Sequence, residues 1–151
     1  MTKEGYTSNE RIKEESDFLR GNISDLLHDG SITHFPSEEE FLLKFHGITQ
    51  QDNRDERLIR KKNGQERNWL FMLRLRLPGG RMTPSQWLAA ETLSDQFGNG
   101  TLKLTTRQAI QIHGVVKQDL KQTMKAIHHA AITTLAASGD ATRAVMVSLH
   151  P

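Results

Sequence analysis

Two segments of the chain, 70–77 and 101–114, hold cationic and neutral hydrogen-bonding side chains but no carboxylate. The arginines among them carry planar forks of N–H donors that suit carboxylates, phosphates and other oxyanions. Such a set is what a surface facing an anion needs. The residues of both segments whose side chains can donate to an anion are Arg74, Arg76, Lys103, Thr105, Arg107, Gln111 and His113.

Both segments alternate between apolar and polar residues, which predicts β-strands. In the first, Leu73, Leu75 and Leu77 share one face, so Arg74 and Arg76 lie on the other. In the second, two short strands meet in a turn at residues 105–107, with Leu102, Leu104, Ile110 and Ile112 pointing one way. The pleat therefore predicts a cationic sheet face opposite an apolar one, and Arg143 is expected to join it.

A cationic strand face can also be an ordinary solvated surface, because charged side chains are mostly exposed. Likewise, His113 taken alone is more typical of a structural histidine than of a ligand. Two strands with the same bias and no neutralising acid favour anion binding instead. The residues by themselves leave open whether the anion is a polycarboxylate, a phosphate, a nucleic acid or a small oxyanion.

Composition excludes several kinds of site. The 151 residues include no cysteine, so this chain supplies no thiolate nucleophile and no iron–sulfur or zinc-thiolate ligand. None of the histidines has the spacing of a metal site. A net charge of +2 is too small to indicate nucleic-acid binding by the whole chain. No run approaches the length of a membrane span and residues 1–4 do not begin a signal peptide, so we expect a cytoplasmic protein without a membrane partner.

The amino-terminal part, residues 1–66, is predicted to be an extended arm with short helices. A capping-box pattern at Thr7 and Glu10 predicts a helix over 8–20, and Ser37 with Glu40 predicts one more helical turn. Residues 22–36 read as turns, 41–47 as a short strand or extended piece, and 50–65 as a solvated, irregular segment.

Residues 67–151 have a more regular pattern. A strand is predicted at 68–77, and Thr83, Pro84 and Gln86 predict the start of a helix that ends near Phe97 with Trp87 facing inward. After the two strands of 101–114, a helix is predicted at 118–137 and a last strand at 144–149. The order β-α-β-β-α-β is that of an α+β, ferredoxin-like half-domain.

Four separated motifs extend the interpretation. The chain resembles the amino-terminal part of the haemoprotein subunits of assimilatory sulfite reductases, within the wider sulfite and nitrite reductase family. The resemblance runs from about residue 9 to 148. The motifs are Arg11 to Gly21, Phe45-His46-Gly47 with Gln51 to Asp55, Leu73 to Gly80, and Leu104 to Gln108 with Gln111 to Gly114.

This resemblance implies an oxidoreductase that reduces sulfite to sulfide with six electrons, using sirohaem coupled to a [4Fe–4S] cluster. It implies that Arg74 and Arg143 hold the substrate anion as catalytic residues. It also implies that sirohaem is contacted by Arg76, Lys103, Thr105, Arg107, Gln111 and His113. The implied partners are sulfite, an NADPH-dependent flavoprotein subunit and the remainder of the haemoprotein.

Two departures from the family pattern matter. The cysteines that hold the cluster are absent, and family members are several times longer, so we expect a fragment or a shortened relative. Such a chain is expected to be inactive alone and to retain neither cofactor. Thr142 and Ala144 also stand where the family usually has asparagines beside the arginine.

Two other functions stay open at this point. A ferredoxin-linked nitrite reductase would share the fold and the cofactors. A non-catalytic module could bind an anion, a tetrapyrrole or RNA on the same face, although that face lacks the aromatic residues on which RNA bases stack.

Overall fold

The computed structural model describes residues 5–148. Its centre is a four-stranded antiparallel sheet in the spatial order β1-β2-β4-β3. The alternation of the sequence correctly predicted the last three of these strands in chain order. The strands are β1 (Ile48–Asp52), β2 (Trp69–Leu75), β3 (Leu102–Leu104) and β4 (Ile110–Val115).

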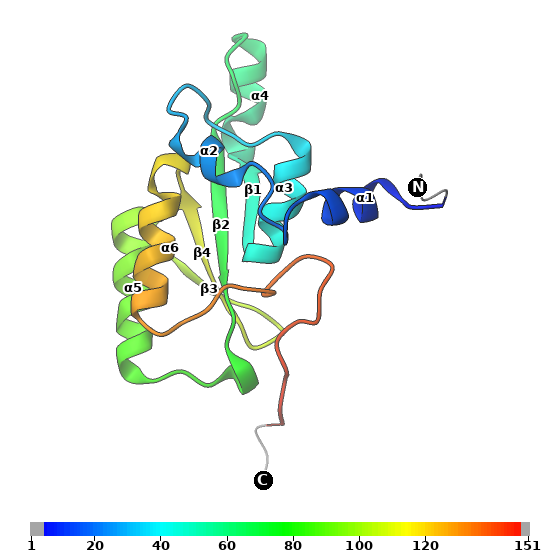
Figure 1. The fold of residues 1–151 in the computed structure, drawn as a ribbon. Coiled ribbons are helices and arrows are strands. Elements are labelled where there is room, and N and C mark those ends of the chain that lie inside the picture. The colour runs from blue at the N-terminus through cyan, green and yellow to red at the C-terminus, as the bar shows by residue number, and fades with distance from the viewer. Residues whose placement is uncertain (1–4, 149–151) are drawn as a thin grey trace.

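Helices α5 (Pro84–Phe97) and α6 (Leu120–His129) lie together on one side of the sheet (Figure 1). The predicted capping box is present at α5, where the Thr83 hydroxyl accepts from the Gln86 N–H and the Gln86 side chain accepts from the Thr83 N–H. Short 3₁₀ helices occupy 78–80 (η2) and 117–119 (η3), the second leading directly into α6.

The sheet buries one face and leaves the other partly open. Leu73 and Leu75 of β2 are fully buried, as are Ile112 of β4 and Ile127 of α6. Arg74 and Arg76, one residue along from these leucines, are only half-buried. The confirmed α+β fold therefore presents the arginines on the face opposite the leucine core.

The amino-terminal part contributes to the same core. Phe35, Leu43 and Ile48 belong to the buried cluster that includes Leu73. α4 (Arg54–Lys62) instead extends beyond the end of the sheet (Figure 1). The helices of this part are α1 (Ser8–Glu15), α2 (Ile23–His28), α3 (Ser37–Leu43), the 3₁₀ helix η1 (Lys44–His46) and α4 (Arg54–Lys62).

The first helix is shorter than the predicted span of 8–20. It ends at Glu15, and the Ser16 hydroxyl then donates to the Lys13 carbonyl and accepts from the Leu19 N–H. Asp17, Phe18 and Leu19 all have positive φ, and Phe18 is 89% exposed. A serine that bonds to the backbone on both sides ends the helix here.

Three other predictions in the arm were wrong. Residues 22–36 contain α2, and 41–47 are helical because Leu42 and Leu43 turn into the core from α3. The strand follows Gly47, and its inward position holds Gln50, whose amide bonds the backbone N–H and carbonyl of Phe35. Residues 54–62, expected to be irregular, form α4 with Asn53 as its cap.

The carboxyl-terminal predictions also need correction. α6 ends at His129, not 137, because Ala131 takes a positive φ and the Ile132 N–H bonds back to the Ile127 carbonyl. No strand forms over 144–148, since β1 and β4 already occupy both sides of β2; Leu149 lies outside the described residues. Trp87 and Leu104 are 43% and 73% exposed and line a surface hollow at the sheet edge.

Candidate functional site: a cationic cleft

Four guanidinium groups surround one hollow on the open face of the sheet, which we call the arginine cleft. It has a volume of about 210 Å³. β2 and the residue after it, the β3–β4 turn and the extended segment 140–148 contribute its walls. The lining residues are Arg74, Arg76, Thr105, Thr106, Arg107, Ala109, Ala137, Arg143 and Ala144.

Arg76 is bound to the loop that follows α6. Its backbone N–H donates to the Thr133 carbonyl at 2.7 Å, an isolated bridge just past the end of β2. Its guanidinium donates to the carbonyls of Leu135 at 3.3 Å and Arg143 at 3.5 Å. Arg76 therefore holds the segment that carries Arg143, and keeps further N–H donors for a ligand.

The β3–β4 turn places Arg107 at the cleft. The Thr105 hydroxyl accepts from the backbone N–H groups of Arg107 at 3.3 Å and Ala109 at 3.1 Å. Gln108 takes a positive φ of 53° to close the turn. Thr105 thus acts here as a turn-forming residue that also lines the cleft, and its hydroxyl, which accepts two bonds, still has one O–H to donate.

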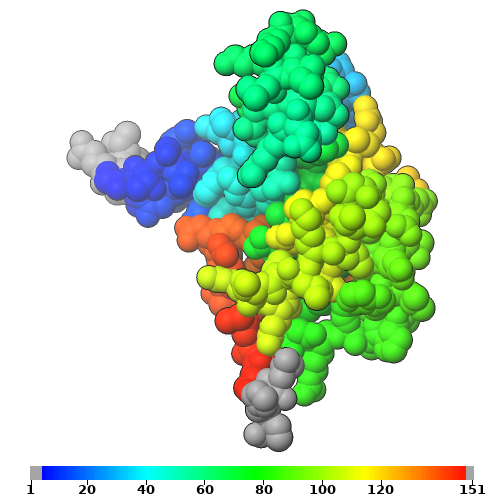
Figure 2. Space-filling view, turned by 180° about the vertical axis from the view of Figure 1, so that it is seen from behind, coloured from blue at the N-terminus to red at the C-terminus, as the bar shows by residue number. Residues whose placement is uncertain are grey.

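Gln108 also holds the segment 144–148 beside this turn. Figure 2 shows the carboxyl-terminal segment and the turn side by side on the molecular surface. Its amide donates to the Val147 carbonyl at 2.8 Å and accepts from the Val147 N–H at 3.1 Å. The Gly79 N–H donates to the Val145 carbonyl at 2.8 Å. The segment is extended and pinned without becoming a strand, which leaves Arg143 exposed at the rim of the cleft.

The cleft has an unbalanced positive charge. Within residues 5–148, none of its four arginines forms an ion pair with a carboxylate. Burial lowers the pKa of Arg74, and the neighbouring charges of Arg143 and Arg107 lower it further. An anion in the cleft would relieve that repulsion.

Gln111 lies between Arg74 and His113. In the amide orientation that satisfies both neighbours, its oxygen accepts from Nη2 and Nε of Arg74 at 2.7 and 3.2 Å, and its nitrogen donates to Nε2 of His113 at 3.1 Å. This arrangement requires a neutral imidazole. Burial, with the charges of Lys103 and Arg74, lowers the pKa of His113.

His113 and Lys103 line a second hollow of about 530 Å³, which we call the polar recess. Arg57 pairs there with Asp52 and holds the pKa of that carboxyl below its usual range. The other lining residues are Gln50, Gln51 and Arg54.

Of the eight predicted site residues, five line the arginine cleft, two line the polar recess, and Gln111 contacts one member of each. Arg54 and Arg57 were not predicted as site residues because 50–65 looked solvated. The sequence did contain a signal for these two residues. Asn53 is a helix cap, and Arg54 and Arg57 follow it one turn apart, which indicates a helix with two cations on one face.

The described part of the chain has neither a metal-binding cluster nor a membrane-spanning helix. Residues 5–148 hold no group of three or more His, Asp or Glu side chains placed to bind a metal ion. None of the helices described there has the length and apolar character needed to cross a membrane.

Comparisons with known proteins give a consistent result. Residues 63–130 match the family described as nitrite/sulfite reductase ferredoxin-like half domain. Over 147 residues the chain is 56% identical to sulfite reductase [NADPH] subunit beta of Saccharomyces cerevisiae, covering 95% of this chain and 10% of that protein. Over 142 residues it is 47% identical to the sulfite reductase [NADPH] hemoprotein beta-component of Bacillus subtilis, covering 94% of this chain and 25% of that protein.

The fold has a solved counterpart. The structure of the Mycobacterium tuberculosis NirA protein matches with a TM-score of 0.73 at 18% identity, covering 94% of this chain and 27% of that one. At that identity the likeness concerns the fold. The chain thus spans between a tenth and about a quarter of the length of the relatives named here.

Proposed function

Residues 63–130 belong to the nitrite/sulfite reductase ferredoxin-like half-domain family, and on that premise we propose that this chain is the amino-terminal portion of a sulfite reductase haemoprotein. Its role is to supply contacts to sirohaem and to sulfite. The observation that carries the proposal is the arginine cleft, which gathers four guanidiniums with no paired carboxylate in residues 5–148.

The donor set fits both anions of the reaction. Sirohaem carries eight carboxylates and sulfite is a small dianion, so the ligands require many N–H donors and little negative charge nearby. In the proposal, Arg74 and Arg143 hold sulfite. Sirohaem carboxylates are held by Arg76, Lys103, Thr105, Arg107, Gln111 and His113.

The chain's own contribution to the reaction is electrostatic. When bound, sirohaem coupled to a [4Fe–4S] cluster would pass to sulfite the six electrons that an external donor delivers. The guanidiniums of Arg74 and Arg143 lower the cost of placing a dianion in the cleft and stabilise charge on its oxygens as they leave as water. The cluster ligands come from outside this chain, which contains no cysteine.

The proposed partners follow from the same assignment. The remainder of the haemoprotein closes the site, and an NADPH-dependent flavoprotein subunit delivers electrons in the cytoplasm. Alone, the chain is proposed to retain neither cofactor and to be inactive.

A chimera tests the proposal. This chain replaces the matching segment of the Bacillus subtilis hemoprotein beta-component, and the product is assayed for tetrapyrrole absorbance and for sulfide formation with a reduced dye as donor. We expect both signals from the chimera and neither from the 151-residue chain alone. The unmodified Bacillus protein is the positive control, and nitrite is assayed in parallel.

Three outcomes would contradict the proposal. The first is a chimera that folds and binds the tetrapyrrole but makes no sulfide. The second is a folded chimera without tetrapyrrole. The third is a chimera that reduces nitrite and not sulfite.

A further inference from the structure

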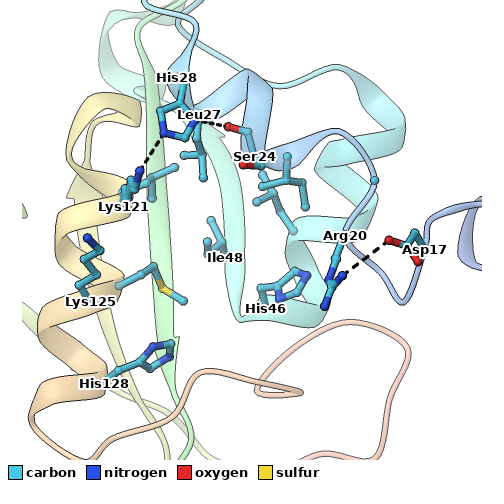
Figure 3. A pocket seen from close by; sticks show the side chains of 15 residues that line it. Asp17, Arg20, Ser24, Leu27, His28, His46, Ile48, Lys121, Lys125 and His128 are labelled. Atoms are coloured by element: carbon cyan, nitrogen blue, oxygen red, sulfur yellow. Dashed lines mark hydrogen bonds and ion pairs between the residues drawn. The ribbon is translucent and has the colours of Figure 1, made fainter.

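Another large hollow lies away from the cationic sheet face. This groove, of about 520 Å³, runs between α6 on one side and α2, η1 and β1 on the other (Figure 3). The segment joining α1 to α2 also contributes to it, so the amino-terminal part and the half-domain each form a wall. Neither the proposed sulfite site nor the sirohaem contacts use it.

The interior of the groove is apolar. Leu43, Ile48 and Leu120 are buried at its base. Ile23, Leu27 and Met124 lie above them, half-buried against the same core. The floor can therefore receive apolar side chains from outside.

The rim is cationic and one wall of it is periodic. Lys121, Lys125 and His128 are spaced at i, i+4 and i+7 on α6, so they follow one face of the helix. At 1.5 Å rise per residue they extend over about 10 Å of wall. Asp17, already paired with Arg20, is the one acid among the lining residues, all of which lie in the described part of the chain.

Lys121 is fixed in position by His28. The Nδ1 of His28 bonds the Ser24 carbonyl at 2.6 Å, so this nitrogen carries the proton. Nε2 is then free to accept from the Lys121 ammonium at 2.8 Å. The lysine charge is thus held at the groove by a neutral partner and stays available to an anion.

From this geometry we propose that the groove is a docking site for an acidic amphipathic helix of a partner protein. The apolar side chains of the partner helix would enter the floor of the groove, and its carboxylates would contact Lys121, Lys125 and His128. This is a helix-in-groove mode of recognition. The spacing of Lys121, Lys125 and His128 along α6 selects the occupant. A single-headed amphiphile such as a fatty acid has one carboxylate and can contact one of these side chains, whereas a helix with carboxylates one turn apart matches all three.

The test uses the full 151-residue chain and a fluorescein-labelled peptide of about 16 residues, long enough to form a helix. The peptide contains Leu, Ala and Glu, with Leu at i, i+3, i+4 and i+7 and Glu flanking that stripe. A matched peptide has Lys in place of every Glu. Binding is followed by fluorescence anisotropy, and amide chemical shifts locate the site.

We expect the Glu peptide to bind, the Lys peptide to fail, and shifts to concentrate on α2 and α6. Lys121→Glu and Lys125→Glu should each weaken binding about tenfold by placing a carboxylate opposite the peptide's own. Lys62→Glu on α4 changes net charge equally but lies outside the groove, and it should stay within about twofold of the unchanged chain.

Circular dichroism shows whether each variant is folded. If Lys121→Glu does not fold, the binding result of Lys125→Glu is used in its place. The proposal is wrong if the Glu peptide does not bind, or if the Lys peptide binds as well. It is equally wrong if Lys62→Glu weakens binding as much as the groove variants, or if oleate binds the groove while the peptide does not.

Discussion

At the residue scale, the arginines of the cationic face differ in how firmly they are held. Arg76 donates to two backbone carbonyls and Arg74 to a side-chain amide, whereas Arg143, which donates to the Gly139 carbonyl at 3.5 Å, and Arg107 are exposed at the rim. Arg74 and Arg76 are held in fixed orientations, and the two exposed arginines add charge. This division explains how a face with no paired acid can keep its guanidiniums oriented.

Arg76→Leu should loosen the loop after α6, because it removes both guanidinium bonds to that loop. We expect a loss of about 1–2 kcal/mol in unfolding free energy and faster amide exchange over residues 133–143. Urea unfolding and exchange rates measure the two effects. Arg81→Leu, at an exposed arginine, should change stability by less than about 0.5 kcal/mol. Equal effects of the two substitutions would show that Arg76 does not hold the loop.

His113 should make stability depend on pH. Its pKa in the folded chain lies below its ordinary value of 6.5, so the unfolded chain takes up a proton first as pH falls. The folded chain therefore keeps its stability at pH values above the ordinary histidine pKa and loses stability as the pH falls below that pKa. In His113→Asn, urea unfolding at about pH 7.5 and about pH 5.5 should differ less than in the unchanged chain. If the difference in stability between the two pH values is as large in His113→Asn as in the unchanged chain, protonation of His113 does not destabilise the folded chain.

At the element scale, the elements whose sequence pattern matched their packing were predictable. β2 was evident because its leucines and arginines alternate, and α5 because Thr83, Pro84 and Gln86 form its cap. β1 was not, because only Ile48 of its two buried positions is apolar and the other holds Gln50, whose amide makes two hydrogen bonds to Phe35. The end of α6 could not be predicted either. Ala131 has the positive φ that ends the helix, and a glycine at that position would have indicated the end in the sequence.

The site was predictable to a similar degree and for the same reason. Strand alternation correctly placed Arg74 and Arg76 on the open face. It could not show that Arg76 binds the loop carrying Arg143, or that Gln108 pins the segment 144–148. Those contacts join residues far apart in the sequence, and no local pattern encodes them.

The junction between η1 and β1 gives a test at this scale. Gly47 has φ +77°, and a Cβ there would clash with the Thr134 carbonyl oxygen. Gly47→Ala should therefore cost more than about 3 kcal/mol in unfolding free energy. Gly64 has φ +64° with nothing near its missing Cβ, so Gly64→Ala should cost only about 1 kcal/mol. Similar losses in urea unfolding would mean that the close contact at Gly47 is absent.

At the scale of the whole molecule, the described amino-terminal part and the half-domain share one core. Phe35, Leu43 and Ile48 pack with the sheet, and the buried Lys117 donates to the Asp29 carbonyl at 2.6 Å. The two parts therefore define two faces. One is the cationic sheet face proposed for sirohaem and sulfite, and the other is the groove beside α6.

The central claim is that the arginine cleft holds sulfite, and Arg74 is its most direct test. In the Bacillus chimera, Arg74→Leu should lower sulfite reduction by about 10²–10³-fold, the usual cost of losing one donor to a developing oxyanion. Arg74→Lys should recover part of the rate, because a point charge replaces the charge but not the forked donors. Arg81→Leu serves as the control.

The measurement is steady-state sulfide formation by variants whose absorbance spectra show equal tetrapyrrole content. The account predicts the order unchanged chimera, then Arg74→Lys, then Arg74→Leu, with Arg81→Leu equal to the unchanged chimera. Wild-type rates in both Arg74 variants, at full tetrapyrrole content, would contradict it: the guanidinium of Arg74 would then not bind sulfite.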